Sequence, residues 1–204
     1  TNGSNELIIA DRNGRAVRFD EDQVRTSGRG AMGVRGMMLD DDDDAVVGMI
    51  VVNDAEKETA MAVSENGYGK RSEIGEYRKT SRAKKGVKTI AVTEKTGKLV
   101  AIKNVTDEND LMIINKSGIV IRMAVANVRV MGRATQGVRL INLAKKNDTI
   151  ASVCKVMSSE LEATVEEESR QKWNETNEKL QQDIVAQDAD ATTDEAGIDA
   201  PEAT

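Results

Sequence analysis

The sequence repeats one pattern three times, and this repeat restricts the possible folds more than any other feature of the chain. Three stretches align without an internal gap on Gly14, Gly67 and Gly118. An arginine stands four, eleven and fifteen residues after each of these glycines, and nineteen residues after it come a second glycine, a valine and a basic residue. Chance does not explain six agreeing positions besides the anchor glycine, and a repeat of about 50 residues is typical of a solenoid, a propeller or an array.

Each repeat unit is predicted to form four β-strands, the content of a propeller blade. A short apolar run, an Asn-Gly or Ser-Gly pair and a second apolar run predict a hairpin with a type I′ turn, in which both central residues have positive φ. Because one four-stranded blade cannot cover both its faces, the units are expected to stack on one another. The third strands are predicted at Val34–Leu39, Val87–Val92 and Val138–Leu143, and the fourth at Val46–Val52, Leu99–Val105 and Ile150–Val156.

The predicted fold class is all-β, a propeller or pinwheel in which three blades of antiparallel strands precede an acidic tail. The blades are expected at about residues 5–53, 58–106 and 109–157, within a domain at 1–157. The tail, 158–204, holds fourteen acidic and three basic side chains. We predict a helix at about 159–183 and disorder after it. The tail either only solvates the protein or acts as an acidic competitor for the basic surface of the domain.

Several classes of site are excluded or disfavoured by composition. The chain has no histidine, so a Ser–His–Asp or Cys–His nucleophile is excluded within it, and Cys154 alone forms no intrachain disulfide or thiolate zinc site. No phosphate-binding GxxxxGK[ST] motif is present. The acidic run Asp40–Asp44 is interpreted as a solvated turn rather than a metal site. We therefore predict no catalytic residue, metal or cofactor in this chain, and no apolar run suggests a membrane span.

The recurring bases are predicted to form a continuous rim that binds the phosphates of double-stranded DNA. Arginine and lysine provide such affinity without reading sequence, and no basic recognition helix or series of aromatic residues indicates base readout. The alternative is a scaffold that binds acidic proteins. The predicted rim consists of Arg25, Arg29, Arg35, Arg78, Lys79, Arg82, Lys84, Lys85, Lys88, Arg129, Arg133 and Arg139. Arg18, Arg71 and Arg122 either join this rim or neutralise nearby carboxylates.

Three segments resemble a known family: GRAVRFDEDQVRTSGRGAMGVRGMML, KTSRAKKGVKTI and GRATQGVRLINL. They are similar to blades of the C-terminal β-pinwheel found in the A subunit of bacterial DNA gyrase, a type IIA topoisomerase, and the resemblance covers residues 5–157. Topoisomerase IV has a similar domain and stays an alternative. In this family the catalytic tyrosine lies in another domain, and Tyr77 is interpreted as a packing residue.

The resemblance implies that this chain holds the last three blades of a six-bladed pinwheel within a much longer polypeptide. It implies wrapping of DNA, so that an ATP-hydrolysing enzyme introduces negative supercoils. The implied partners are the gyrase B subunit together with a second A subunit in an A2B2 complex, and ATP and Mg²⁺ act elsewhere in that complex. The implied location is the bacterial cytoplasm.

Overall fold

A computed structural model describes residues 1–143 and 148–158 and the single positions 167, 170 and 173. The chain divides into two compact parts, Thr1–Ser158 and Ser159–Thr204. Glu167, Arg170 and Trp173 are helical. The rest of the helix predicted at 159–183, and the predicted disorder beyond it, lie outside the described residues.

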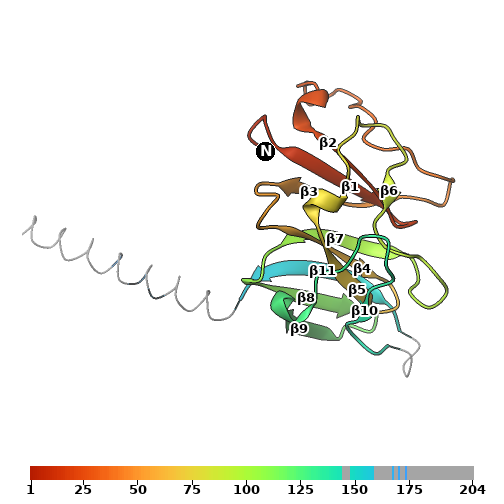
Figure 1. The fold of residues 1–204 in the computed structure, drawn as a ribbon, viewed down its shortest axis with the longest axis vertical. Helices are drawn as coiled ribbons and strands as arrows, with labels where there is room; N and C mark the ends of the chain where they lie inside the picture. The colour runs from red at the N-terminus through yellow and green to blue at the C-terminus, as the bar shows by residue number, and fades with distance from the viewer. Residues whose placement is uncertain (144–147, 159–166, 168–169, 171–172, 174–204) are drawn as a thin grey trace, which may run out of the picture. The chain divides into compact units, whose positions relative to one another are not determined.

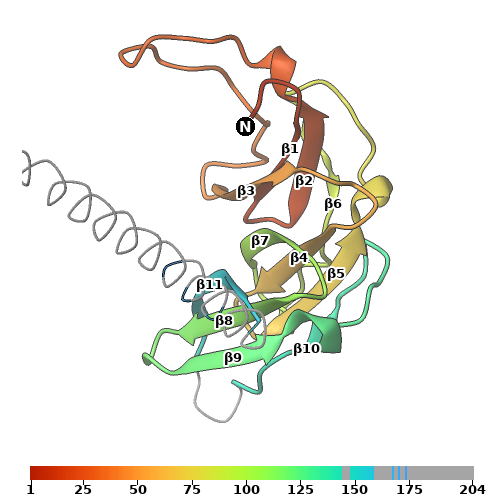
Figure 2. The ribbon, with the colours of Figure 1, turned by 90° about the vertical axis from the view of Figure 1, so that its left-hand side faces the viewer.

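The first part is built from antiparallel strands in three sheets (Figures 1 and 2). The sheet orders are β3-β1-β2-β6, β10-β5-β4-β7 and β11-β8-β9. A short 3-10 helix follows the second strand of each unit, and these are η1 (Glu21–Gln23), η2 (Ile74–Glu76) and η3 (Val125–Asn127). The prediction of an all-β fold is confirmed. The strands are β1 (Glu6–Asp11), β2 (Arg15–Asp20), β3 (Val46–Val52), β4 (Thr59–Ser64), β5 (Tyr68–Glu73), β6 (Val87–Lys88), β7 (Leu99–Val105), β8 (Asn109–Asn115), β9 (Val120–Ala124), β10 (Val138–Arg139) and β11 (Ile150–Met157).

The predicted third strands are wrong in length and in partner. The strands β6 and β10 have two residues each and pair with β2 and β5, which belong to the preceding unit. Residues 34–39 form no strand and make one isolated bridge, from Met37 to Lys84. Glycine explains the close approach, because a Cβ at Gly86 would collide with the Ala16 carbonyl, and one at Gly137 would lie 2.6 Å from the Gly69 carbonyl oxygen. Each of the first two sheets is therefore completed by the following unit.

The hairpin between the first two strands of each unit exists, but its predicted turn type is wrong. Gly14, Gly67 and Gly118 have φ of 80°, 83° and 84°, whereas the residues before them do not have positive φ. One positive-φ residue after a turn fits a type I turn with a glycine bulge rather than a type I′ turn. In the first hairpin the N–H of Gly14 donates to the Asp11 carbonyl at 3.2 Å, and the other two hairpins make the same bond.

The apolar core lies between neighbouring sheets. One cluster joins Ile8 and Ile50 of the first sheet to Ile102 of the second, and another joins the second sheet to Ile113 of the third. Residues at the same position of two units differ in burial according to whether a neighbouring sheet covers them. Leu99 and Val46 each begin the last strand of their unit, yet Leu99 is 1% exposed and Val46 is 52% exposed. Because burying such a side chain is worth about 1.5–3 kcal/mol, contacts between units supply much of the stability.

Candidate nucleic-acid interface

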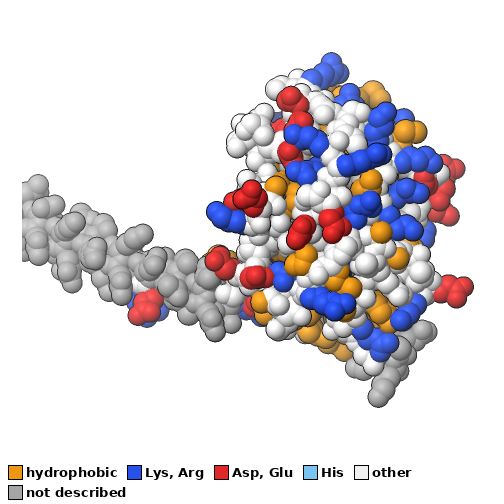
Figure 3. All heavy atoms as spheres, viewed as in Figure 1, with side chains coloured by type: hydrophobic (Ala, Val, Ile, Leu, Met, Phe, Trp, Pro, Cys, Tyr) orange, Lys and Arg blue, Asp and Glu red, His pale blue; other side chains and the backbone are white. Residues whose placement is uncertain are grey.

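Basic side chains extend over the first unit and down one side of the molecule (Figure 3). The bases that recur at eleven, fifteen and twenty-one residues after the anchor glycine follow the 3-10 helices, and Lys88 and Arg139 among them stand on the two-residue strands. The structure separates the recurring bases into groups that the sequence did not distinguish. Each group is named by its distance in residues from the anchor glycine of its unit.

The plus-11 arginines (Arg25, Arg78 and Arg129) point outward beside an anchored backbone. Each stands two residues after a 3-10 helix. In the second and third units the residue between is buried, because Tyr77 and Val128 are each 1% exposed. Tyr77 shares a hydrogen bond of 2.5 Å with Thr89, and burial raises the pKa of its phenol. Its predicted packing role is confirmed. Within the described residues nothing holds the guanidinium groups of the plus-11 arginines, so they are free to bind an anion.

The plus-21 bases (Arg35, Lys88 and Arg139) differ in their surroundings. Lys88 and Arg139 stand on β6 and β10, opposite Arg15 and Tyr68 of the preceding unit. The guanidinium of Arg139 lies 5.7 Å from the centre of the Tyr68 ring and donates to its hydroxyl at 3.1 Å. All three bases are exposed. The contact of Arg139 with Tyr68 was not predicted from the sequence.

The plus-15 arginines follow another pattern. Arg82 and Arg133 are half-buried and donate to backbone carbonyls of the preceding unit. Arg29, in the first unit, is exposed and makes no such bond within the described residues.

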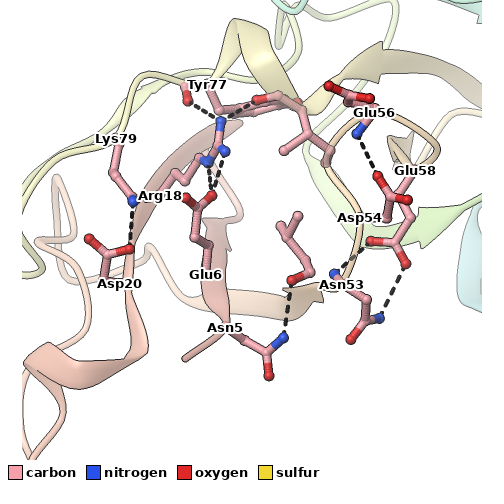
Figure 4. Close-up of polar contacts among 12 residues, drawn as sticks. Asn5, Glu6, Arg18, Asp20, Asn53, Asp54, Glu56, Glu58, Tyr77 and Lys79 are labelled. Carbon is pink, nitrogen blue, oxygen red and sulfur yellow. Dashed lines mark hydrogen bonds and ion pairs between the residues drawn. The ribbon is translucent and has the colours of Figure 1, made fainter. Parts of the chain in front are cut away.

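The plus-4 arginines pair with acids. Arg18 lies between the Glu6 carboxylate, 2.6 Å from its Nε, and the carbonyls of Ile74 and Tyr77 in the next unit (Figure 4). Arg71 is 7% exposed, pairs with Asp107 and donates to the carbonyl of Val128.

Arg122 pairs with Asp110 at 2.8 Å. The ion pairs of all three plus-4 arginines fit the alternative in which these residues neutralise carboxylates.

Two lysines of the second unit, Lys79 and Lys85, face acids of the first. Lys79 lies 2.8 Å from Glu6 and 2.6 Å from Asp20 (Figure 4 shows the contact with Asp20). The Nζ of Lys85 lies 2.8 Å from Asp40. The hydrogen bond and charge of Lys85, with the nearby Arg15, keep the pKa of Asp40 below its usual value. Lys84 is exposed, and its ammonium has no partner among the described residues.

The solvated turn predicted at Asp40–Asp44 is confirmed for residues 40–43, which are exposed, and is wrong for Asp44. Asp44 is buried and accepts N–H bonds from Asn13, Asp40 and Ala45. Next to it, Asp11 is fully buried, and its Oδ2 has no hydrogen-bond partner. Burial raises the pKa of Asp11 to about 6, although the Arg15 N–H bond lowers it, and Asp44 and Asp40 raise it further.

Lys70 is a second buried ionisable group that sequence reasoning missed. Its Nζ donates to Ser72 at 2.7 Å and to the Gly132 carbonyl of the next unit at 3.0 Å. Burial lowers the pKa of this lysine to about 8. The repeat offered a signal, since Lys70 occupies the position of the apolar Val17 and Ile121.

The described residues offer little for other classes of site. They contain no group of three His, Cys, Asp or Glu side chains arranged to hold a metal ion. None of the helices described is long and apolar enough to cross a membrane.

Comparison with known families decides what kind of repeat this is. A family model described as the DNA gyrase C-terminal domain, a β-propeller, matches residues 5–53, 58–106 and 109–154, which together exceed half of the chain. The chain belongs to the DNA gyrase C-terminal domain family. The family's repeat therefore corresponds to the three units described above.

Curated relatives are gyrase A subunits. The DNA gyrase A subunit of Staphylococcus aureus (strain NCTC 8325 / PS 47) is 38% identical over 189 residues, which are 92% of this chain and 21% of that protein. The Deinococcus deserti protein of the same name is 44% identical over 153 residues, 74% of this chain and 19% of that protein. The chain thus spans about a fifth of the length of these relatives.

Solved structures agree with the fold. The DNA gyrase A C-terminal domain superposes with a TM-score of 0.68 and 28% identity, covering 76% of this chain and 51% of that domain. The C-terminal domain of DNA topoisomerase IV gives a TM-score of 0.72 and 25% identity, covering 82% of this chain and 53% of that domain. The gyrase C-terminal β-propeller fold is therefore common to the family model and to a solved structure.

Proposed function

We propose that this chain is the DNA-wrapping region of a gyrase A subunit, where it bends duplex DNA along its rim of bases. The observation that carries the proposal is the recurrence at plus-11, in every unit, of exposed arginines that have no partner in the part of the chain that the structure describes. Spaced cations on one outer surface suit the regular phosphates of a duplex and carry no base preference. Bending 20–30 bp by 40–90° costs on the order of 1–6 kcal/mol, which contacts from successive units would offset.

Salt dependence of binding tests this proposal. DNA affinity falls as salt rises, and we expect the triple substitution R25Q/R78Q/R129Q to make this fall less steep. The steepness of log affinity against log salt should decrease by about 2.7, at about 0.9 for each lost phosphate contact. A matched control removes three bases outside the registered positions, R12Q/K57Q/K116Q. Equal slopes for the two triple variants would exclude the rim, and binding of acidic proteins in place of DNA would favour the scaffold alternative.

The catalytic setting is part of the same proposal. Wrapping by this region would supply DNA to a type II topoisomerase in which ATP hydrolysis and strand cleavage belong to other domains. The gyrase B subunit together with a second A subunit would complete an A2B2 complex in the bacterial cytoplasm. Support comes from the gyrase A relatives, of which the chain spans about a fifth. A supercoiling assay on the reconstituted complex carrying R25Q/R78Q/R129Q should show relaxation retained and negative supercoiling lost.

A further inference from the structure

Arg82 and Arg133 make the same pair of bonds at two successive junctions between units. The Nε of Arg82 donates to the Gln23 carbonyl at 3.1 Å, and its Nη1 donates to the Arg35 carbonyl at 2.9 Å. Arg133 repeats this arrangement at the next junction. Its Nε donates to the Glu76 carbonyl at 3.1 Å and its Nη1 to the Lys88 carbonyl at 2.7 Å. One side chain therefore bridges two separate segments of the preceding unit each time.

The preceding unit returns a bond at each junction. The side-chain Oε1 of Gln23 accepts the backbone N–H of Arg82 at 2.9 Å. The Oε2 of Glu76 accepts the backbone N–H of Arg133 at 2.5 Å. Both the side chain and the backbone of each arginine are thus fixed to the last residue of the preceding 3-10 helix. In each of these arginines, two N–H groups of the guanidinium donate to protein carbonyls and are therefore not available to a phosphate.

The bridged segments are those that carry exposed bases. Arg25 stands two residues after Gln23, and Arg35 is itself the second acceptor. In the second unit Arg78 stands two residues after Glu76, and Lys88 is the second acceptor. Among the described residues nothing holds the charged ends of these four bases, so their spacing depends on the backbone that the bridging arginines hold.

We propose that Arg82 and Arg133, here called the clamp arginines, are positioning residues for DNA wrapping rather than phosphate ligands. Each holds the plus-11 and plus-21 bases of the preceding unit at a fixed separation and fixes the angle to the next unit. A rim that bends DNA must resist the elastic recoil of the duplex, and a rigid fork across each junction provides that resistance. The inference rests on the proposed function.

A substitution that keeps the charge separates the two roles. Lysine still binds a phosphate as a point charge, but it lacks the planar fork that reaches two carbonyls in fixed geometry. The test compares R82K/R133K with the matched control R12K/R15K, at two arginines outside the predicted rim, in the full 204-residue chain. A phosphate role for the clamp arginines makes the two double variants alike, whereas a positioning role makes only the first one defective.

Two measurements are made on each variant. Hydrogen exchange follows the amides of Thr80 and Met131, which donate across the junctions to the carbonyls of Arg18 and Arg71 at 2.8 Å. We expect exchange at both amides to be about tenfold or more faster in R82K/R133K and unchanged in R12K/R15K. Fluorescence energy transfer across a duplex of about 30 bp at saturating protein reports the bend angle, which should fall only in R82K/R133K. Affinity for a duplex of about 10 bp should stay within about twofold, because the number of cations is unchanged.

Each outcome decides something. If R82K/R133K matches R12K/R15K in exchange and in bend angle, the positioning role is overturned. If the wild-type chain does not bend DNA, the proposed function fails and the role in wrapping fails with it, whatever the exchange rates. Should R82K/R133K not fold, Q23A/E76A removes the reciprocal bonds at both junctions while keeping both arginines, and a loss of bend angle is required of it as well.

Discussion

Replacing Asp11 by asparagine should stabilise the protein at neutral pH, because the native carboxylate is buried with one oxygen unpartnered. Its Oδ1 accepts the N–H of Arg15 at 2.7 Å, and an amide oxygen keeps this bond. The third unit already uses this solution, since Asn115 stands at the equivalent position and its Oδ1 accepts the N–H of Ile119 at 2.6 Å. The substitution therefore copies a local structure that the chain itself contains.

The magnitude follows from the pKa of Asp11, which rises from its usual 3.8 to about 6. At 1.36 kcal/mol per unit, ionisation of this carboxyl in the folded state costs up to about 3 kcal/mol. Below pH 3.8 the group is protonated in both states and costs nothing. Between pH 3.8 and 6 the unfolded chain loses the proton first, so the folded state loses stability as pH rises. Above pH 6 the full cost is present.

Urea denaturation of Asp11→Asn and the wild type at pH 4 and pH 7.5 measures the effect. We expect the free energy of unfolding of the variant to exceed that of the wild type by about 2–3 kcal/mol at pH 7.5 and to be nearly equal at pH 4. Asp42→Asn removes one exposed charge from the same acidic run and serves as the control. A gain that is the same at both pH values, or as large in the control, would refute the assignment to the buried carboxyl.

Three further predictions concern stability and DNA binding. Because burial lowers the pKa of Lys70 to about 8, the unfolded chain binds more protons than the folded one above that pH. The free energy of unfolding of the wild type, measured by urea titration relative to that of Lys70→Met, should therefore rise by about 1 kcal/mol from pH 7 to pH 9. If the free energies of the two proteins change equally with pH, the prediction is wrong. Gly86→Ala should lower the free energy of unfolding, measured by thermal denaturation, by about 3 kcal/mol or more, because the residue has a φ of +76° and the new Cβ would collide with the Ala16 carbonyl. The control Gly28→Ala, whose Cβ would enter open space, should lower it by less than about 0.5 kcal/mol. Asp40→Asn releases Lys85 from its ion pair and should tighten DNA binding severalfold in fluorescence titrations at low salt, an effect that about 0.5 M salt should abolish.

The repeat was enough to predict the first, second and fourth strands of each unit, because apolar runs bounded by glycine and asparagine specify hairpins locally, but it did not predict the third strands. The boundaries of β3 and β7 agree with the prediction to the residue. Pairing between units could not be predicted, since the partner of Val87–Lys88 depends on how close Gly86 lets two backbones come. The prediction of a type I′ turn was wrong because an Asn-Gly pair is compatible with more than one kind of hairpin turn. In the first and third units the side chains of Asp11 and Asn115 accept backbone N–H groups of the turn and stabilise the conformation observed.

The candidate interface shows a similar division between local and tertiary information. Register predicted which bases recur, but not which of them are free. Arg18 and Arg82 are as basic in sequence as Arg78, yet the first pairs with Glu6 and the second binds backbone carbonyls. Only the tertiary structure places those acceptors beside them. Whether the predicted rim bases contact DNA stays a prediction, and the substitutions above test it.

The exchange of short strands between units has a consequence for synthesis on the ribosome. The first sheet gains its fourth strand only when Val87–Lys88 has been made, and the second only when Val138–Arg139 has. During translation each of the first two units therefore waits, with an open edge on its second strand, until about 35 residues beyond its own last strand have been made. Folding is thus tied to the direction of synthesis, and a stalled or truncated chain would expose the unpaired edge of its last unit to other chains.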